Sequence, residues 1–143
     1  MIRAVLDTNV IISALTHKKF TPPSVILSLI EDKKLLHVTS PEILDEVEEV
    51  MNREKVVKMH NLQPREIRNL ILNLAEISEI VHAKNETSIV KADPDDDKFI
   101  AAAIGGSASF IISGDRHLLE IGGYQGIKIM KVRNFLENVI QKT

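Results

Sequence analysis

Four acidic residues stand at positions where a protein could use them to hold a metal ion: Asp7, Glu46, Asp97 and Asp115. Carboxylate oxygens are hard ligands that suit Mg²⁺ or Mn²⁺, and such ions can activate a water and stabilise the oxygens of a reacting phosphate. The chain has no cysteine, and its five histidines show no zinc-ligand spacing. A bound metal would therefore need oxygen ligands.

Two of these acids also have a simpler interpretation as helix caps. Asp7 follows the apolar run 2–6, and Asp115 closes Ser113-Gly114-Asp115 after the run 109–112. An aspartate in that position commonly accepts hydrogen bonds from the first amides of the next helix. Capping alone would account for Asp7 and Asp115.

The acidic run 93–97 needs more than capping, because it places four carboxylates in five positions, where they repel one another. A calcium loop starting at Asp93 fails, because its sixth position is Lys98 instead of glycine and its twelfth is Ile104 instead of glutamate. The spacing favours Asp97 pointing toward a sheet edge, while Asp95 and Asp96 are expected to be solvated.

Glu46 lies in a strongly acidic segment, for which a solvated helix face is the simpler interpretation. When the apolar residues Ile43, Val47 and Met51 form the buried stripe, helical geometry puts Glu46 at its margin. Glu46 is thus the acid of this segment best placed to reach inward, with Glu42 as its rival.

Convergence of all four carboxylates would be costly without a counterion. Each like-charge contact at about 4 Å costs on the order of 4 kcal/mol at an effective dielectric near 20, against a typical stability of roughly 5–15 kcal/mol. Some of the acids are then protonated, or a divalent cation is bound, or the acids do not converge. The sequence leaves these three options open.

The elements that would position these acids alternate along the chain. Strand-like apolar runs lie at 2–6, 35–38, 79–82, 109–112 and 127–130. Apolar residues recur at helical spacing in six segments. These are 10–15, 22 to about 34, 41 onward, 53–78 with a break at 63–64, 93 to about 104, and 132–140. Parallel strands need helical crossovers, so the pattern predicts a three-layer α/β/α sandwich with a mainly parallel central sheet. Ligands bind at the carboxyl ends of such strands, where at least three of the four acids would meet.

Composition limits the class of protein. A chain of 143 residues with 44% apolar residues can build one core, so we expect a single domain over 1–143. It has no run of about 18 apolar residues, and Asp7 interrupts the start before a signal core could form, so we expect a cytoplasmic protein without membrane contact. The net charge of -2 gives no global attraction to nucleic acid.

These motifs, in this order, resemble those of the PIN-domain family of nucleases, over most of the chain from Ile2 to about Leu119. The family pattern begins with Asp7-Thr8-Asn9 after the first strand, carries a glutamate that aligns with Glu46, and continues with Asp97 before the alanine-rich stretch 101–103. The fourth acid closes Ser113-Gly114-Asp115, where relatives often have threonine at the first position. The chain is most similar to toxins of the VapC type from toxin-antitoxin pairs.

The resemblance implies Mg²⁺- or Mn²⁺-dependent hydrolysis of single-stranded or structured RNA, leaving a 5′-phosphate and a 3′-hydroxyl. Asp7 and Asp97 would form the main metal site, with Asp115 and Glu46 completing it or binding a second ion. The supporting residues that would orient the ligands are Thr8, Asn9 and Ser113. A cognate antitoxin and a homodimer are the protein partners it implies.

Basic residues are the candidates for RNA contact, although on helices they more often only solubilise a surface. They are Arg53, Lys55, Lys58, Arg65, Arg68 and Arg116. The aromatic content of 3% argues against extensive base stacking.

Two other classes of protein remain as alternatives. A non-catalytic PIN-like interaction module would keep the fold and use its apolar helices for dimerisation or antitoxin binding, and the intact acids count against it. A receiver domain would show an acidic pair at the first strand and a lysine after a late strand. Here Asp7 is followed by Thr8, and the segment 113–115 contains no lysine.

Overall fold

A mainly parallel sheet organises the computed structural model, which describes residues 1–16, 21–82 and 97–142, and only the backbone of Asp97. The strands are β1 (Arg3–Leu6), β2 (Leu36–Thr39), β3 (Ser78–Ile80), β4 (Phe110–Ile112), β5 (Gly123–Tyr124) and β6 (Ile127–Met130). Their order across the sheet is β3-β2-β1-β4-β6-β5, and only β5 runs antiparallel to its neighbour. The predicted parallel sheet is confirmed.

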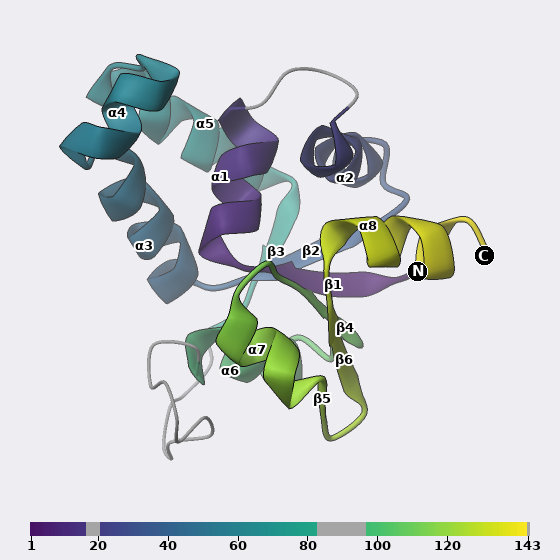
Figure 1. The fold of residues 1–143 in the computed structure, drawn as a ribbon. Coiled ribbons are helices and arrows are strands. Elements are labelled where there is room, and N and C mark those ends of the chain that lie inside the picture. Colours follow the sequence, from purple (N-terminus) through teal and green to yellow (C-terminus); the bar gives the residue numbers. More distant parts are fainter. Residues whose placement is uncertain (17–20, 83–96, 143) are drawn as a thin grey trace.

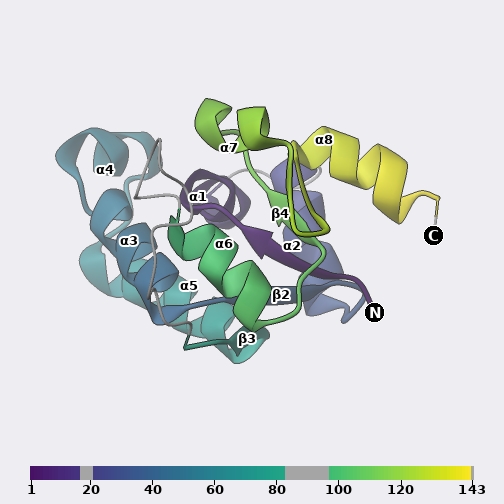
Figure 2. The same cartoon turned by 90° about the horizontal axis from the view of Figure 1, so that it is seen from below.

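Helices cover both faces of this sheet. They are α1 (Thr8–Thr16), α2 (Pro22–Glu31), α3 (Pro41–Met51), α4 (Glu54–His60), α5 (Pro64–Glu76), α6 (Asp97–Gly105), α7 (Arg116–Ile121) and α8 (Val132–Phe135), which continues as the π-helical segment Leu136–Ile140. Figure 1 shows α1, α2 and α8 on one face and α6 and α7 on the other, and Figure 2 shows the same arrangement from below. The predicted three-layer sandwich is therefore confirmed. In the described residues, no helix is long and apolar enough to cross a membrane.

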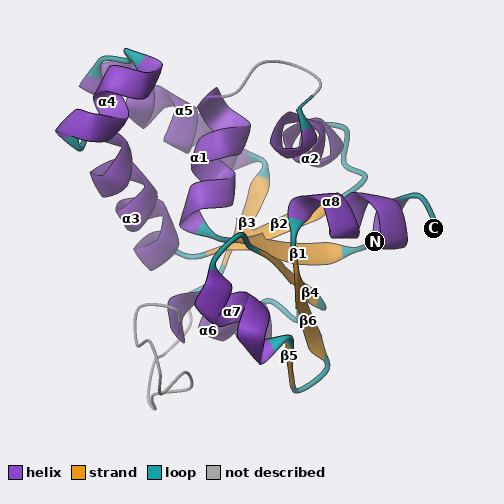
Figure 3. Cartoon of the chain, viewed as in Figure 1, coloured by secondary structure: helices purple, strands orange, loops and turns teal. Residues whose placement is uncertain are grey.

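Local signals set most of the element boundaries (Figure 3). Ser40 caps α3 by accepting a hydrogen bond from the amide of Ile43 at 3.3 Å, directly before Pro41. The predicted break falls at Pro64, where α5 begins. The strand β3 starts one residue earlier than predicted, and the two-residue β5 is too short to give a sequence pattern. The helix predicted to open at Asp93 is described only from Asp97, and the earlier residues lie outside the described part.

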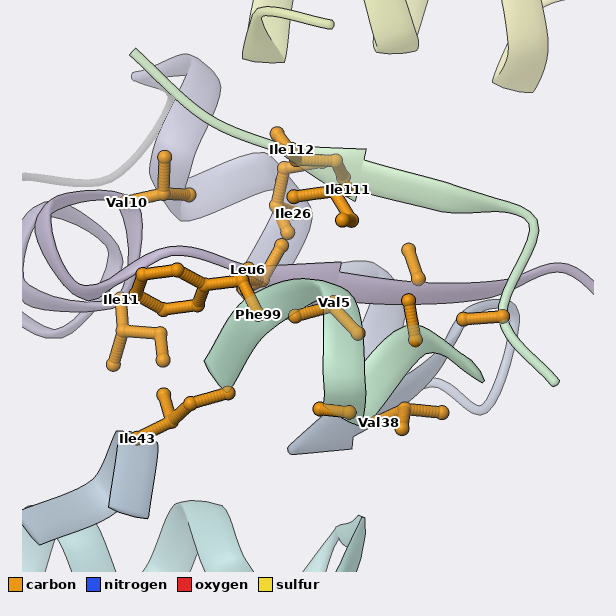
Figure 4. Close-up of a cluster of buried hydrophobic side chains, with 14 of the residues drawn as sticks. Val5, Leu6, Val10, Ile11, Ile26, Val38, Ile43, Phe99, Ile111 and Ile112 are labelled. Atoms are coloured by element: carbon orange, nitrogen blue, oxygen red, sulfur yellow. The ribbon is translucent and has the colours of Figure 1, made fainter. Parts of the chain in front are cut away.

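The central strand β1 is buried on both faces. Ala4, Val5 and Leu6 are each at most 1% exposed. Figure 4 shows Val5 and Leu6 among side chains from both helical layers, with Phe99 from α6 and Ile11 from α1 close by. Burial on both faces explains why this strand reads as a continuous apolar run instead of an alternating one.

The chain leaves β1 and β4 in opposite directions along the sheet. From β1 it crosses to β2 on one side, whereas from β4 it crosses to β6 on the other. Leu6 pairs with Ile112, so the residues that follow, Asp7 and Ser113, emerge side by side at the carboxyl edge. The amide of Asp7 donates to the carbonyl of Ile112 at 3.0 Å. Sheets of this kind bind ligands at such a switch point.

Gly106 is required by a close approach between α6 and β2. A Cβ built on Gly106 would lie 2.4 Å from Cγ1 of Val38, a buried residue of β2. We predict that Gly106→Ala lowers the free energy of unfolding by about 1–3 kcal/mol, measured by urea denaturation. Gly114→Ala is the matched control, because a Cβ there meets no atom within 4 Å. Equal stability of the two variants would contradict this account of Gly106.

A fully buried histidine lies in β2. His37 Nδ1 is 2.7 Å from Ser78 Oγ, whose single hydrogen is donated to the carbonyl of Leu74 at 2.6 Å. Nδ1–H must therefore be the donor, and Nε2 is the bare nitrogen, without a partner in the described part of the chain. Burial lowers the pKa of His37 to about 4, and a second proton would place an N–H on Nε2, which has no acceptor among the described residues.

His37 should make stability fall in mild acid. Because the folded state excludes a proton that the unfolded chain binds, the free energy of unfolding should drop by about 3 kcal/mol as the pH falls from 6.5 to 4. Urea denaturation at a series of pH values measures this slope. His37→Asn keeps an N–H donor near Ser78 but does not titrate, so its curve should lack this contribution. If the free energy of unfolding fell equally with pH in both proteins, His37 would not be the cause.

Candidate active site

Asp7 is held at the carboxyl end of β1 by donors from two segments. Its Oδ1 accepts from the amide of Val10 at 2.8 Å, so Asp7 also caps α1. Its Oδ2 accepts from the hydroxyl of Ser113 and from the amide of Gly114 at 3.3 Å. The side chain is thereby fixed between the start of α1 and the turn after β4.

Burial raises the pKa of the Asp7 carboxyl above its ordinary value, because the residue is 4% exposed and its charge is desolvated. The hydrogen bonds from Ser113, Val10 and Gly114 offset this in part, and the negative charge of Asp115 raises the pKa further. No described lysine, arginine or histidine forms an ion pair with Asp7. The carboxylate thus lacks a counter-charge within the described part of the chain.

Asp115 is the second acid at this edge, and Ser113 connects it to Asp7. The amide of Asp115 donates to Ser113 Oγ at 2.9 Å, while the Ser113 hydroxyl donates to Asp7. The Asp115 carboxylate accepts from the amide of His117 at 2.9 Å and caps α7. Both acids are therefore helix caps and also electrostatic neighbours. The role of Ser113 in orienting metal ligands stays a prediction.

Glu46 was expected to help hold a metal ion, but in the structure its partner is a lysine. Its carboxylate forms an ion pair with Lys98 of α6, and the two side chains are 29% and 18% exposed. The pair joins α3 to the first turn of α6, which begins at Asp97. The sequence interpretation missed this partnership, although Lys98 directly follows the acidic run.

The structure brings Asp7 and Asp115 together and places Glu46 beside the start of α6. The side chain of Asp97 and all of 93–96 lie outside the described residues. Within the described part, no three histidine, cysteine, aspartate or glutamate side chains form a group that could hold a metal by themselves. Full convergence of the four acids stays a prediction.

The residues next to Asp7 suit a hard cation. Thr8 is buried, and its Oγ1 has no hydrogen-bond partner among the described residues, an arrangement that costs free energy unless a ligand or water satisfies it. Asn9 is exposed at the mouth of two pockets. Asp7, Thr8 and Asp115 offer only oxygen donors at this edge of the sheet, which is the donor chemistry that Mg²⁺ or Mn²⁺ prefers.

Most of the basic residues predicted to contact RNA are neutralised by glutamates. The ion pairs are Arg53–Glu49 at 2.9 Å, Lys58–Glu54 at 3.7 Å, Arg68–Glu48 at 3.3 Å and Arg116–Glu120 at 3.1 Å. Lys55 and Arg65 are exposed and have no ion pair within the described part. These contacts favour the solubilising role for the four paired residues. Two cations that the sequence interpretation missed, Lys131 and Arg133, line a pocket at the edge where Ser113 lies.

Fold and site together define an α/β protein with an acidic cluster at the switch point of a parallel sheet. The pattern of the PIN domain family matches residues 3–117, and the chain belongs to this family. The match includes Asp7, Glu46, Asp97 and Asp115.

Two individual proteins extend the comparison. The chain is 33% identical over 133 residues to an uncharacterized protein of Methanocaldococcus jannaschii, covering 93% of this chain and 82% of that protein. This chain also has the same fold as a chain in the crystal structure of VapBC2 from Rickettsia felis bound to a DNA fragment from the VapBC2 promoter. The TM-score is 0.59 and the sequence identity is 13%. That likeness covers 90% of this chain and 97% of the other.

A divalent cation should stabilise the folded protein through Asp7. A ligand that binds only the folded state at 100 times its Kd adds about 2.7 kcal/mol, which for a domain of this size raises the Tm by roughly 10 °C. We expect Mn²⁺ to raise the Tm of the unaltered protein, in a thermal melt, much more than that of Asp7→Asn. Glu42→Gln removes an exposed carboxylate of α3 and should keep the full response. Equal shifts for all three proteins would place the metal elsewhere.

Proposed function

We propose that this chain is a metal-dependent endoribonuclease, with residues 1–143 acting as one PIN-like domain. The observation that carries the proposal is the buried carboxylate of Asp7, which has a raised pKa, no ion pair in the described part, and Asp115 as a charged neighbour. Membership of the PIN domain family supports the nuclease class.

The chain's own residues would prepare the site for a cation. Asp7 and Asp115, with Asp97 and Glu46 as further expected ligands, would hold Mg²⁺ or Mn²⁺, which supplies water activation and charge screening when bound. Ser113, through its hydroxyl, fixes the Asp7 carboxylate and so limits the entropy lost on binding. Protonation of Asp7 competes with metal binding, so its raised pKa makes metal affinity fall as the solution becomes acidic.

The reaction that suits this site is hydrolysis of a phosphodiester bond. The oxygen of a water forms a bond to phosphorus while the bond from phosphorus to O3′ breaks, giving a 5′-phosphate and, after O3′ takes up a proton, a 3′-hydroxyl. No cysteine is present in the chain to act as a covalent nucleophile. Direct attack by water, assisted by carboxylates, needs none.

In the cell we propose the role of a toxin held in check by an antitoxin protein, in a cytoplasmic homodimer. The shared fold with a chain of the VapBC2 structure supports this assignment. An apolar pocket of about 560 Å³ between α1, α3 and α4 would suit a protein partner. Its lining includes Ile12, Val56 and the 82% exposed Met59.

That same pocket favours a second candidate function, a non-catalytic PIN-like interaction module. Such a module would use the apolar pocket to hold a protein partner and would have no need of a buried Asp7 carboxyl that lacks an ion pair in the described part. The two candidates differ in whether loss of the Asp7 charge matters.

RNA cleavage separates them. We expect purified protein to cut a labelled single-stranded RNA pool with Mn²⁺ or Mg²⁺ and not with EDTA. Asp7→Asn and Asp97→Asn should each lose at least 100-fold in rate, because each removes a carboxylate expected to hold the cation that stabilises the charge of the transition state. Glu42→Gln should retain near-normal activity. Unchanged cutting by a folded Asp7→Asn variant would remove Asp7 from the mechanism, and absence of cutting with every metal would favour the interaction module.

A further inference from the structure

A second pocket, of about 340 Å³, lies between α1, α2 and α8 at the carboxyl edge of the sheet. Its lining includes Asn9, Pro22, Ser113, Gly114, Lys131 and Arg133. The pairing of β4 with β6 explains this composition, because Ile112 pairs with Met130 and the amide of Ser113 donates to the carbonyl of Met130 at 3.0 Å. Lys131 therefore emerges beside Ser113, directly before α8; Figure 1 shows α8 on the same face of the sheet as α1 and α2.

The pocket borders the acidic site, because Ser113 and Gly114 line it and both donate hydrogen bonds to Asp7. Gly114 lines it and donates its amide to Asp7 Oδ2 at 3.3 Å. A Cβ built on Gly114 meets no atom within 4 Å, so the space beside this backbone is open. A group bound in the pocket would therefore lie next to the residues that fix Asp7.

Lys131 and Arg133 bring positive charge to this pocket. Both are exposed, and within the described part neither forms an ion pair. They differ in this from Arg53, Lys58 and Arg116, each of which is paired with a glutamate one helical turn away. Free cations at a concave surface attract anions more strongly than cations that already have a partner.

RNA binding to this protein would need local positive charge. The net charge is -2, and Asp7 and Asp115 repel an approaching phosphate until a cation neutralises them. Contacts from lysine and arginine to phosphates supply affinity and set the register of a nucleic acid. Positive charge beside the acids, and not on remote helices, could hold the backbone while the scissile phosphate lies at Asp7.

We propose that Lys131 and Arg133 form a phosphate-binding subsite that holds the RNA backbone next to the bond to be cut. The inference rests on the proposed nuclease function and adds where the substrate is held. Arg133 supplies a planar fork suited to two phosphate oxygens, and Lys131 supplies a compact charge. The subsite contacts phosphates of the RNA backbone and not the bases. It therefore adds affinity and positions the RNA without sequence preference.

RNA binding in EDTA tests the subsite separately from cleavage. The probe is a fluorescent single-stranded RNA pool, titrated with protein at several salt concentrations. Lys131→Gln/Arg133→Gln should raise the Kd at least tenfold, and should reduce the slope of log K against log salt by roughly 1.4, because each lost phosphate contact on a single strand contributes about 0.7.

The matched control removes the same charge at the opposite edge of the sheet. Lys34 lies in a pocket with Met1 and Ser109 at the amino edge, and Lys128 pairs with Phe110 at the beginning of β4. Both control residues are exposed. Lys34→Gln/Lys128→Gln should therefore bind RNA within about twofold of the unaltered protein.

The possible results distinguish the two proposals. Equal affinities for the two double variants, or no RNA binding by the unaltered protein even at the lowest salt concentration, would overturn the subsite. Weakened binding in the Lys131→Gln/Arg133→Gln variant supports it, even if no cleavage is found with any metal, in which case the nuclease proposal alone fails. Metal-dependent cleavage with equal affinities would leave the nuclease standing without this subsite.

Discussion

Burial of the Asp7 carboxylate is the constraint on which the rest of this structure depends. The residue ends the central strand, which is covered by helices on both faces, so its charge leaves water as the domain folds. The turn after β4 partly compensates with a hydroxyl from Ser113 and an amide from Gly114. Because those donors come from a segment more than a hundred residues away, the acidic edge forms only when the whole sheet is assembled.

The acidic residues near this edge differ in whether they have a positively charged partner. Glu46 has Lys98 as a counter-charge, an arrangement that was not among the three options left open by the sequence. Asp7 and Asp115 have no such partner in the described part and are linked through Ser113. Among the described residues, Lys98 therefore supplies a counter-charge to Glu46, whereas Asp7 and Asp115 have none.

The sheet and its helical layers could be predicted because buried parallel strands give continuous apolar runs and their crossovers give helical spacing. Asp7 and Asp115 could be selected as candidates because Asp7 directly follows such a run and Asp115 follows another run after Ser113 and Gly114. Lys98 as the partner of Glu46 could not be found, because that contact joins residues 52 positions apart. The choice of RNA-binding cations missed a signal that was present. Arg53, Lys58 and Arg116 each have a glutamate four residues away, which favours local pairing.

Lys131 and Arg133 were overlooked for a different reason. They stand in an ordinary polar segment, and only the register of β6 against β4 brings them beside Ser113. Register is a property of the folded sheet, so no local window of sequence contains it.

The two outermost strands have a consequence for how copies of this protein could associate. Within the described residues, β3 has three residues and β5 has two, so each edge strand offers only a very short ladder of free amides and carbonyls there. Short edges are a common protection against joining one sheet to another. A continuous intermolecular sheet is therefore disfavoured, and a homodimer of this chain would have to be built from helix surfaces, where side-chain shape and not backbone pairing decides the partner.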